Sequence, residues 1–203
     1  MKKELSFRTD LAIDIAEVRK VSSESGLVTE ETTKNGVSVN RIKITNDEAA
    51  EKFGKAKGNY ITVDLSGAFI DATTHTAAVD VIAEEISNLL HGLDSLKKEK
   101  SVLVVGLGND NMSSDAIGPG TAEGILVTRH LKEYMPELYS ELKLSNVSVL
   151  IPRVLGQTGI ESADIIKAAI DKTSPDAVVV IDALASRSMT RLCKTVQITD
   201  TGI

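Results

Sequence analysis

Three short apolar runs, separated by stretches with helical periodicity, constrain this chain more than any other feature. They are residues 102–105 (VLVV), 147–154 (VSVLIPRV) and 176–183 (DAVVVIDA). Continuous β-branched runs of this kind are typical of parallel strands that helices cover on both faces. The alternation of strand and helix predicts a right-handed, doubly wound arrangement. We therefore expect an α/β three-layer sandwich, with a mostly parallel twisted sheet covered by helices on both faces.

Weaker patterns predict the remaining elements. We expect strands at 37–45, 60–65 and 195–198, and helices at 48–53, 73–90 and 160–170, with a further helix that starts at Gly118-Pro119 and carries Ile125, Leu126 and Leu131. Asn46 is a good N-cap for the helix at 48–53. The apolar face predicted for the helix at 73–90 consists of Val79, Ile82, Ile86 and Leu89. Residues 1–25 fit a strand and a helix equally well, and Gly156 and Gly159 frame a predicted loop.

Composition excludes several classes of function. The 203 residues are 42% hydrophobic, which suffices for a substantial core, and the formal net charge is -6 with the two signs interspersed. This pattern indicates neither a nucleic-acid-binding face nor a patch for anionic membranes. A single cysteine, Cys193, excludes an intramolecular disulfide. Because no run approaches the ~20 apolar residues of a membrane span, we expect a cytoplasmic protein with no membrane partner.

Two aspartates follow two of the apolar runs. Asp115 lies in the polar loop after residues 102–105, and Asp182 ends the run at 176–183. The carboxyl ends of parallel strands share one edge of a sheet, where ligands collect, so these two carboxyl groups can meet there. Repulsion would then raise one pKa and leave a carboxylate base beside a carboxylic acid, the chemistry of acid-assisted amide hydrolysis. The alternative is that each aspartate caps a helix or braces a loop.

The glycines at the start of the same loop suggest a second interpretation. Gly106-Leu107-Gly108 after a strand is the first half of the dinucleotide-binding pattern G-x-G-x-x-G. Asn111 occupies the place of the third glycine, and the following helix starts late for a pyrophosphate site. A tight turn explains both glycines, and a non-catalytic nucleotide-binding module remains the alternative.

Several longer strings resemble one protein family. They are FRTDLAID (7–14), VVGLGNDNMSSDAIGP (104–119), LVTRHL (126–131), GQTGIESADII (156–166), PDAVVVIDALASRS (175–188) and QITDTGI (197–203). Together they resemble the germination proteases of endospore-forming bacteria, atypical aspartic endopeptidases without a pepsin fold. The resemblance implies that Asp115 and Asp182 are catalytic and that no cofactor or metal is required. It also implies a phosphorylase/hydrolase-like fold shared with hydrogenase-maturation proteases, in which the same carboxylates would instead grip a nickel ion.

The resemblance further implies how such a protein is made and used. Members of this family are zymogens that remove their own N-terminal segment, which here would be residues 1–10 with Asp10–Leu11 as the scissile bond; a disordered tail is the alternative. The peptidase domain would be residues 11–203, without the C-terminal portion of the family. The implied substrates are small acid-soluble spore proteins, in the forespore or spore core, and the implied assembly is a homotetramer.

Other residues invite interpretations that we weigh lower. Asp200-Thr201-Gly202 spells the triplet of pepsin-like enzymes, but those proteins are all-β, so we expect a loop after the last strand. His75, His91 and His130 lack the spacing of metal ligands, and only His130 is close in sequence to the site region. Arg129 and Arg187 are candidates to brace a carboxylate, with solvated or structural roles as the alternative.

Overall fold

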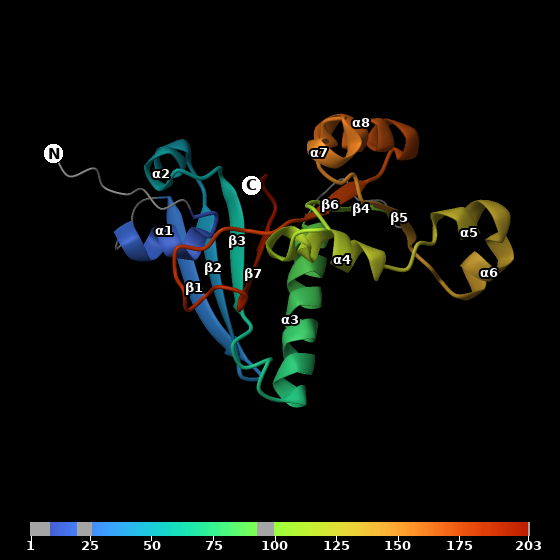
Figure 1. Cartoon of the computed structure of the whole chain (residues 1–203). Coiled ribbons are helices and arrows are strands. Elements are labelled where there is room, and N and C mark those ends of the chain that lie inside the picture. The colour runs from blue at the N-terminus through green and yellow to red at the C-terminus, as the bar shows by residue number, and fades with distance from the viewer. Residues whose placement is uncertain (1–8, 20–25, 93–99, 203) are drawn as a thin grey trace. The chain divides into compact units, whose positions relative to one another are not determined.

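The computed structural model describes residues 9–19, 26–92 and 100–202 (Figure 1), and the chain divides into two compact units. Unit 1 consists of Met1–Gly92 and Leu184–Ile203, and unit 2 of Leu93–Ala183. No helix in the described ranges combines the length and the hydropathy that a membrane span requires.

Unit 1 is built on an antiparallel sheet with the strand order β1-β2-β3-β7. The strands are β1 (Leu27–Lys34), β2 (Val37–Ile44), β3 (Gly58–Asp64) and β7 (Thr195–Thr199). β1 and β2 form a hairpin whose two-residue turn, Asn35-Gly36, has φ values of 51° and 83°. Two successive positive φ angles match the twist of a hairpin, and asparagine followed by glycine adopts them at least cost. The predicted strands at 37–45, 60–65 and 195–198 are confirmed.

The helix α3 (Ala72–His91) covers one face of this sheet, with only part of the predicted apolar face. Ile82 and Leu89 pack against the cluster that contains Val39 and Val63, whereas Val79 is 52% exposed. The buried positions of α3 are instead Ala77, Ala78, Val81 and Glu85. Small alanines let the helix approach the sheet closely, and Glu85 is buried because Arg41 of β2 pairs with it.

The other face of the sheet is covered at one end by α1 (Ala12–Arg19) and α2 (Asp47–Phe53). Their contacts with the sheet form a core of Ala12, Ile42, Ile44, Phe53 and Tyr60. α2 follows the sequence prediction: the Asn46 side chain accepts a hydrogen bond from the Ala49 N–H, and Gly54 ends the helix with φ 74°. At the other end of the face the residues are polar.

Unit 2 is a parallel sheet between helices, which confirms the predicted α/β class. Its strand order is β5-β4-β6, and its strands are β4 (Ser101–Gly106), β5 (Asn146–Leu150) and β6 (Ala177–Ile181). Figure 1 shows α4 (Ile117–Glu123) on one side of this sheet and α7 (Leu155–Thr158) with α8 (Ser162–Thr173) on the other. The sequence patterns did not predict the separate antiparallel sheet of unit 1, and the closing strand β7 belongs to it.

Unit 2 departs from the predictions in several places. β6, predicted to be fully buried, is an edge strand in which Val178 and Val180 are 38% and 46% exposed. The helix predicted after Gly118 ends at Gly124, Leu126 is exposed, and separate helices α5 (Arg129–Tyr134) and α6 (Pro136–Glu141) follow. The predicted loop at 156–159 is largely the short helix α7, which Gly159 ends with φ 73°. The apolar runs therefore predicted where these strands lie. They did not predict which of the apolar side chains would remain exposed.

Candidate active site

The carboxyl ends of β4 and β6 lie side by side in unit 2. Gly106 is the register partner of Ile181, and the Leu107 N–H donates to the Ile181 carbonyl over 2.8 Å. Asp182 follows Ile181 directly, and Asp115 ends a single 3₁₀ turn, Ser113–Asp115, in the loop after β4. The structure thus brings both predicted aspartates to one edge of the parallel sheet, and both are half-buried.

Close backbone packing explains two glycines of this loop. A Cβ atom on Gly108, whose φ is 122°, would lie 2.1 Å from the Asp115 carbonyl oxygen. A Cβ atom on Gly118 would lie 2.0 Å from the Leu107 oxygen and 2.5 Å from the Ile181 oxygen. Because both contacts are with backbone atoms, any larger residue would push the loops of β4 and β6 apart. These contacts favour the tight-turn explanation of the glycines over a phosphate cradle.

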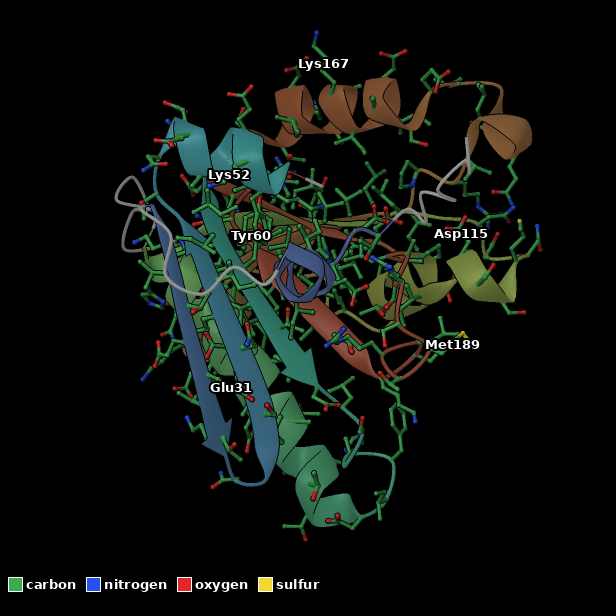
Figure 2. All side chains as sticks on the ribbon, turned by 90° about the vertical axis from the view of Figure 1, so that its left-hand side faces the viewer. Glu31, Lys52, Tyr60, Asp115, Lys167 and Met189 are labelled. Carbon is green, nitrogen blue, oxygen red and sulfur yellow. The ribbon has the colours of Figure 1, made fainter. Side chains whose placement is uncertain are left out.

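Two backbone hydrogen bonds fix Asp115, which is labelled in Figure 2. Its N–H donates to the Met112 carbonyl over 2.8 Å, and its carbonyl accepts from the Asn109 N–H over 3.0 Å. Across residues 9–19, 26–92 and 100–202, no donor or cation binds the Asp115 carboxylate. A half-buried carboxylate on a fixed backbone with free lone pairs is suited to accept a proton from water.

Asp182 is oriented by the chain that follows it. Its Oδ1 accepts from the Ala183 N–H over 2.8 Å, which ties the carboxylate to the end of β6. A backbone donor at a carboxylate limits the rotamers that the side chain can adopt.

A polar cluster that the sequence analysis did not identify lies where the loop after β5 meets the loop after β4. Arg153, after β5, pairs with Asp110 over 3.0 Å, and the Gln157 Nε2 of α7 donates to the Oδ1 atoms of Asn109 and Asp110 over 3.0 and 3.1 Å. We call these four residues the β5–α7 clamp. It connects the loop after β5 to the loop that carries Asp115. The sequence contains a signal for this cluster, namely the polar residues that follow each strand. We searched for site residues only after β4 and β6.

The predicted scissile bond Asp10–Leu11 lies in unit 1, while residues 1–8 are outside the described residues. The Asp10 N–H donates to the Ala185 carbonyl over 2.8 Å, and the Ala185 N–H donates to Asp10 Oδ2 over 2.9 Å. The Asp10 carbonyl accepts from Lys55 Nζ and Gln197 Nε2 over 3.0 and 3.3 Å. Leu11 is only 3% exposed. The residues on both sides of this bond are therefore fixed, Asp10 by hydrogen bonds and Leu11 by burial.

Comparison with known proteins decides the family. The sequence profile of the germination proteases matches residues 8–203. This chain belongs to the germination protease family.

Several members of the family are closely similar. The germination protease of Caldanaerobacter subterraneus subsp. tengcongensis is 41% identical over 98% of this chain and 60% of its own length. The proteins of the same name from a Geobacillus species and from Clostridium perfringens are 42% and 41% identical, over 98% and 97% of this chain and 55% and 60% of their own lengths. The chain thus spans somewhat over half the length of these relatives.

The remaining candidates of the sequence analysis have other positions in this chain. Asp200 accepts hydrogen bonds from the backbone N–H and side-chain amide of Asn59, so it braces the start of β3 in unit 1. His75, His91 and His130 are all exposed, on α3 and α5. The part of the chain that the structure describes contains no group of three or more histidine, cysteine, aspartate or glutamate side chains placed to hold a metal ion. Arg129 begins α5, and the Arg187 N–H donates to Asp14.

Proposed function

We propose that this chain carries the peptidase centre of a germination protease, an endopeptidase in which Asp115 and Asp182 hydrolyse peptide bonds. The observation that supports this most is the placement of both carboxylates at the adjoining ends of β4 and β6, in a chain of this family. No cofactor is invoked.

The chemistry follows from two carboxyl groups that share one edge. In the proposed reaction one carboxyl group starts ionised and the other starts protonated. The ionised member takes a proton from the attacking water, and the protonated member gives one to the departing amine. Atoms balance because the water supplies the hydroxyl of the new acid and a proton of the new amine.

The family also supports the finer parts of the proposal. The relatives carry the name germination protease, and on that ground we extend to this protein the degradation of small acid-soluble spore proteins in the spore core. We propose a zymogen that cleaves itself at Asp10–Leu11, and a homotetrameric assembly.

The test uses the protein at the full length of its relatives, incubated with a small acid-soluble spore protein. Products of the wild type and of the Asp115→Asn and Asp182→Asn variants are compared by mass spectrometry. Asp164→Asn is the matched control, because Asp164 lies exposed on α8 of the same unit. Loss of substrate cleavage and of self-processing in both site variants, with folding intact, supports the pair. Normal cleavage by either variant excludes that aspartate from catalysis.

The same proteins separate the two alternatives from the sequence analysis. A maturation protease of the hydrogenase type would show nickel-dependent binding of its partner that both aspartate variants lose. A nucleotide-binding module would show a rise in melting temperature with nucleotides, since a ligand that binds only the folded state stabilises it. Either result without peptide cleavage would contradict the proposal.

A further inference from the structure

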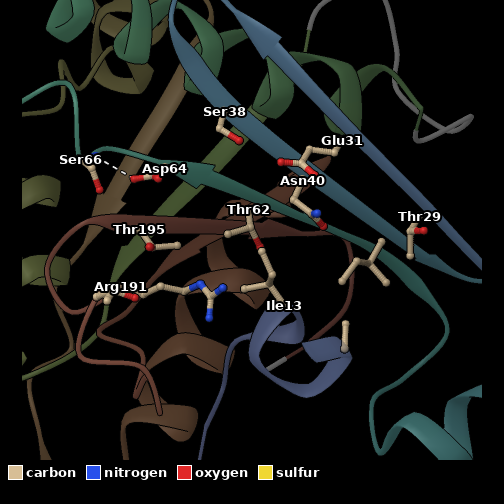
Figure 3. A pocket seen from close by; sticks show the side chains of 13 residues that line it. Ile13, Thr29, Glu31, Ser38, Asn40, Thr62, Asp64, Ser66, Arg191 and Thr195 are labelled. Atoms are coloured by element: carbon tan, nitrogen blue, oxygen red, sulfur yellow. Dashed lines mark hydrogen bonds between the residues drawn. The ribbon is translucent and has the colours of Figure 1, made fainter. Parts of the chain in front are cut away.

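At the polar end of the antiparallel sheet in unit 1, side chains line a cavity of about 740 Å³ (Figure 3). Its walls include the sheet residues Glu31, Asn40, Thr62 and Asp64, with Ile13 of α1 and Arg191 opposite them. The volume lies within the range of ligand-binding sites, which is about 300–1,000 Å³. Figure 3 shows the side chains of Asn40 and Thr62 on adjacent strands at the floor of this cavity.

The strand register makes this floor a continuous polar row. Glu31 of β1 is the partner of Asn40, Asn40 of Thr62, and Thr62 of Gln197. Register partners project from the same face of a sheet with their Cβ atoms about 5 Å apart. One ligand group can therefore reach two neighbouring side chains of the row.

Two buried oxygen atoms in the row have no hydrogen-bond partner among the residues that the structure describes. They are the Oγ1 of Thr62, which is 5% exposed, and the Oδ1 of Asn40. Folded proteins rarely retain an unsatisfied buried polar group without a reason, because leaving it without a partner costs free energy. A bound donor at this position would remove that cost.

The charge of the cavity indicates what kind of donor fits. Arg191 pairs over 2.5 Å with Asp14, which is 2% exposed, so its positive charge is compensated. Glu31 forms no ion pair within residues 9–19, 26–92 and 100–202, and Asp64 accepts only the Ser66 N–H there. The uncompensated charge is therefore negative. A guanidinium group carries a positive charge, five N–H donors and no acceptor, which complements a row of acceptors.

We propose that this cavity binds a peptide segment through an arginine side chain, with the guanidinium bonded to Asn40 and Thr62 and attracted by Glu31 and Asp64. The cavity is lined by residues of unit 1, whereas Asp115 and Asp182 belong to unit 2, and binding in the cavity does not depend on the proposed peptide hydrolysis. It would hold a polypeptide by its basic residues, whatever bond is cut elsewhere.

The test measures binding to the whole chain by fluorescence anisotropy at low ionic strength. The probe is a labelled Gly-Arg-Gly-Arg-Gly peptide, and its counterpart has glutamate in place of arginine. The arginine peptide is expected to bind and the glutamate peptide is not. Thr62→Val should raise Kd about tenfold, because it removes a buried acceptor of a charged donor. Glu31→Gln and Asp64→Asn should each raise Kd up to about fivefold, because exposed charges interact weakly.

Glu30→Gln is the matched control. Glu30 is adjacent to Glu31 on β1 and makes the same change of charge, but strand alternation puts it on the opposite face, where it acts on Arg41. Its Kd should equal that of the wild type. Thr62→Val should also leave the melting temperature unchanged or raise it, which separates lost binding from lost folding.

Three results would overturn the proposal: no binding of the arginine peptide, equal binding of the glutamate peptide, or site variants that match Glu30→Gln. The wild type alone provides a second measurement. The arginine peptide should shift the backbone amide resonances around Asn40 and Thr62, and shifts confined to unit 2 would contradict the site. Because no bond is broken in either measurement, they fail or succeed separately from the proposed peptidase activity.

Discussion

Asp14 lies in the first turn of α1 and Asp115 at the end of a 3₁₀ turn, and the surroundings of the two carboxylates are opposite. Asp14 is 2% exposed and accepts from Thr9, Ser186, the Arg187 N–H and Arg191. Burial opposes its ionisation, but the hydrogen bonds from Thr9, Arg187 and Arg191 outweigh burial and hold the pKa of its carboxyl below its ordinary value. Asp115 has a fixed backbone and a carboxylate with no partner among the described residues. A carboxylate saturated with donors stabilises the fold, whereas an unsaturated one is available for chemistry.

The largest effect that this comparison predicts is on catalysis. Asp115→Asn in a protein of full family length should lower kcat about 10³-fold, because a general acid or base contributes 10²–10⁴-fold. Its melting temperature should stay at the wild-type value, since the carboxylate makes no bond that the amide would lose. Steady-state kinetics and thermal unfolding measure the two effects. A lower melting temperature with normal kcat would reverse the roles assigned to Asp115 and Asp14.

Asp14→Ala should show the opposite pattern in stability. It leaves Arg191 and the Arg187 N–H without their acceptor, and breaking a buried pair from one side costs about 3–5 kcal/mol. Urea unfolding should therefore give a midpoint well below that of the wild type. Asp164→Ala on α8 serves as the control, because Asp164 is exposed and its loss should leave the midpoint unchanged. A midpoint equal to that of the control would show that the Asp14 network contributes nothing.

The pH dependence of unfolding tests whether the ionised form of Asp14 stabilises the fold. The folded pKa of Asp14 is lowered relative to its unfolded value, so its contribution is complete above the unfolded pKa, near 3.8, and is lost as pH falls through the folded pKa. The wild type should lose stability below about pH 4 more steeply than Asp14→Asn, which has no proton to take up. Urea midpoints across the acid range measure this difference. Parallel curves for the two proteins would contradict the assignment.

The β5–α7 clamp should give the smallest effect. Gln157→Leu removes the donor to Asn109 and Asp110, and the Asn109 N–H in turn fixes the Asp115 carbonyl. We expect kcat to fall about tenfold with KM nearly unchanged, since one misplaced hydrogen bond costs about 1 kcal/mol. Gln157→Glu tests the reason, because it retains the shape but places a like charge beside Asp110. A rise in KM alone would show that Gln157 contacts substrate and does not position Asp115.

The candidate site could be predicted in part because topology determines it. Parallel strands present their carboxyl ends at one edge, so Asp115 and Asp182 were found from the apolar runs that precede them. Arg153 and Gln157 of the clamp were missed, since their partners, Asn109 and Asp110, belong to a loop far earlier in the chain. Gln157 and Asp110, for example, are 47 residues apart. Side-chain pairs across loops leave no periodic signal in a single sequence.

The sequence alone determined the alternation of strands and helices, the cap at Asn46, and the aspartates at the strand ends. These follow from local periodicity and backbone preferences, which each segment carries by itself. The tertiary structure decided which faces are covered: Val79 and Val180 are exposed although apolar, Glu85 and Asp14 are buried although charged. It also decided that β7 joins an antiparallel sheet and leaves a polar cavity there. Burial depends on the partners that distant segments bring, and those partners exist only once the chain has folded.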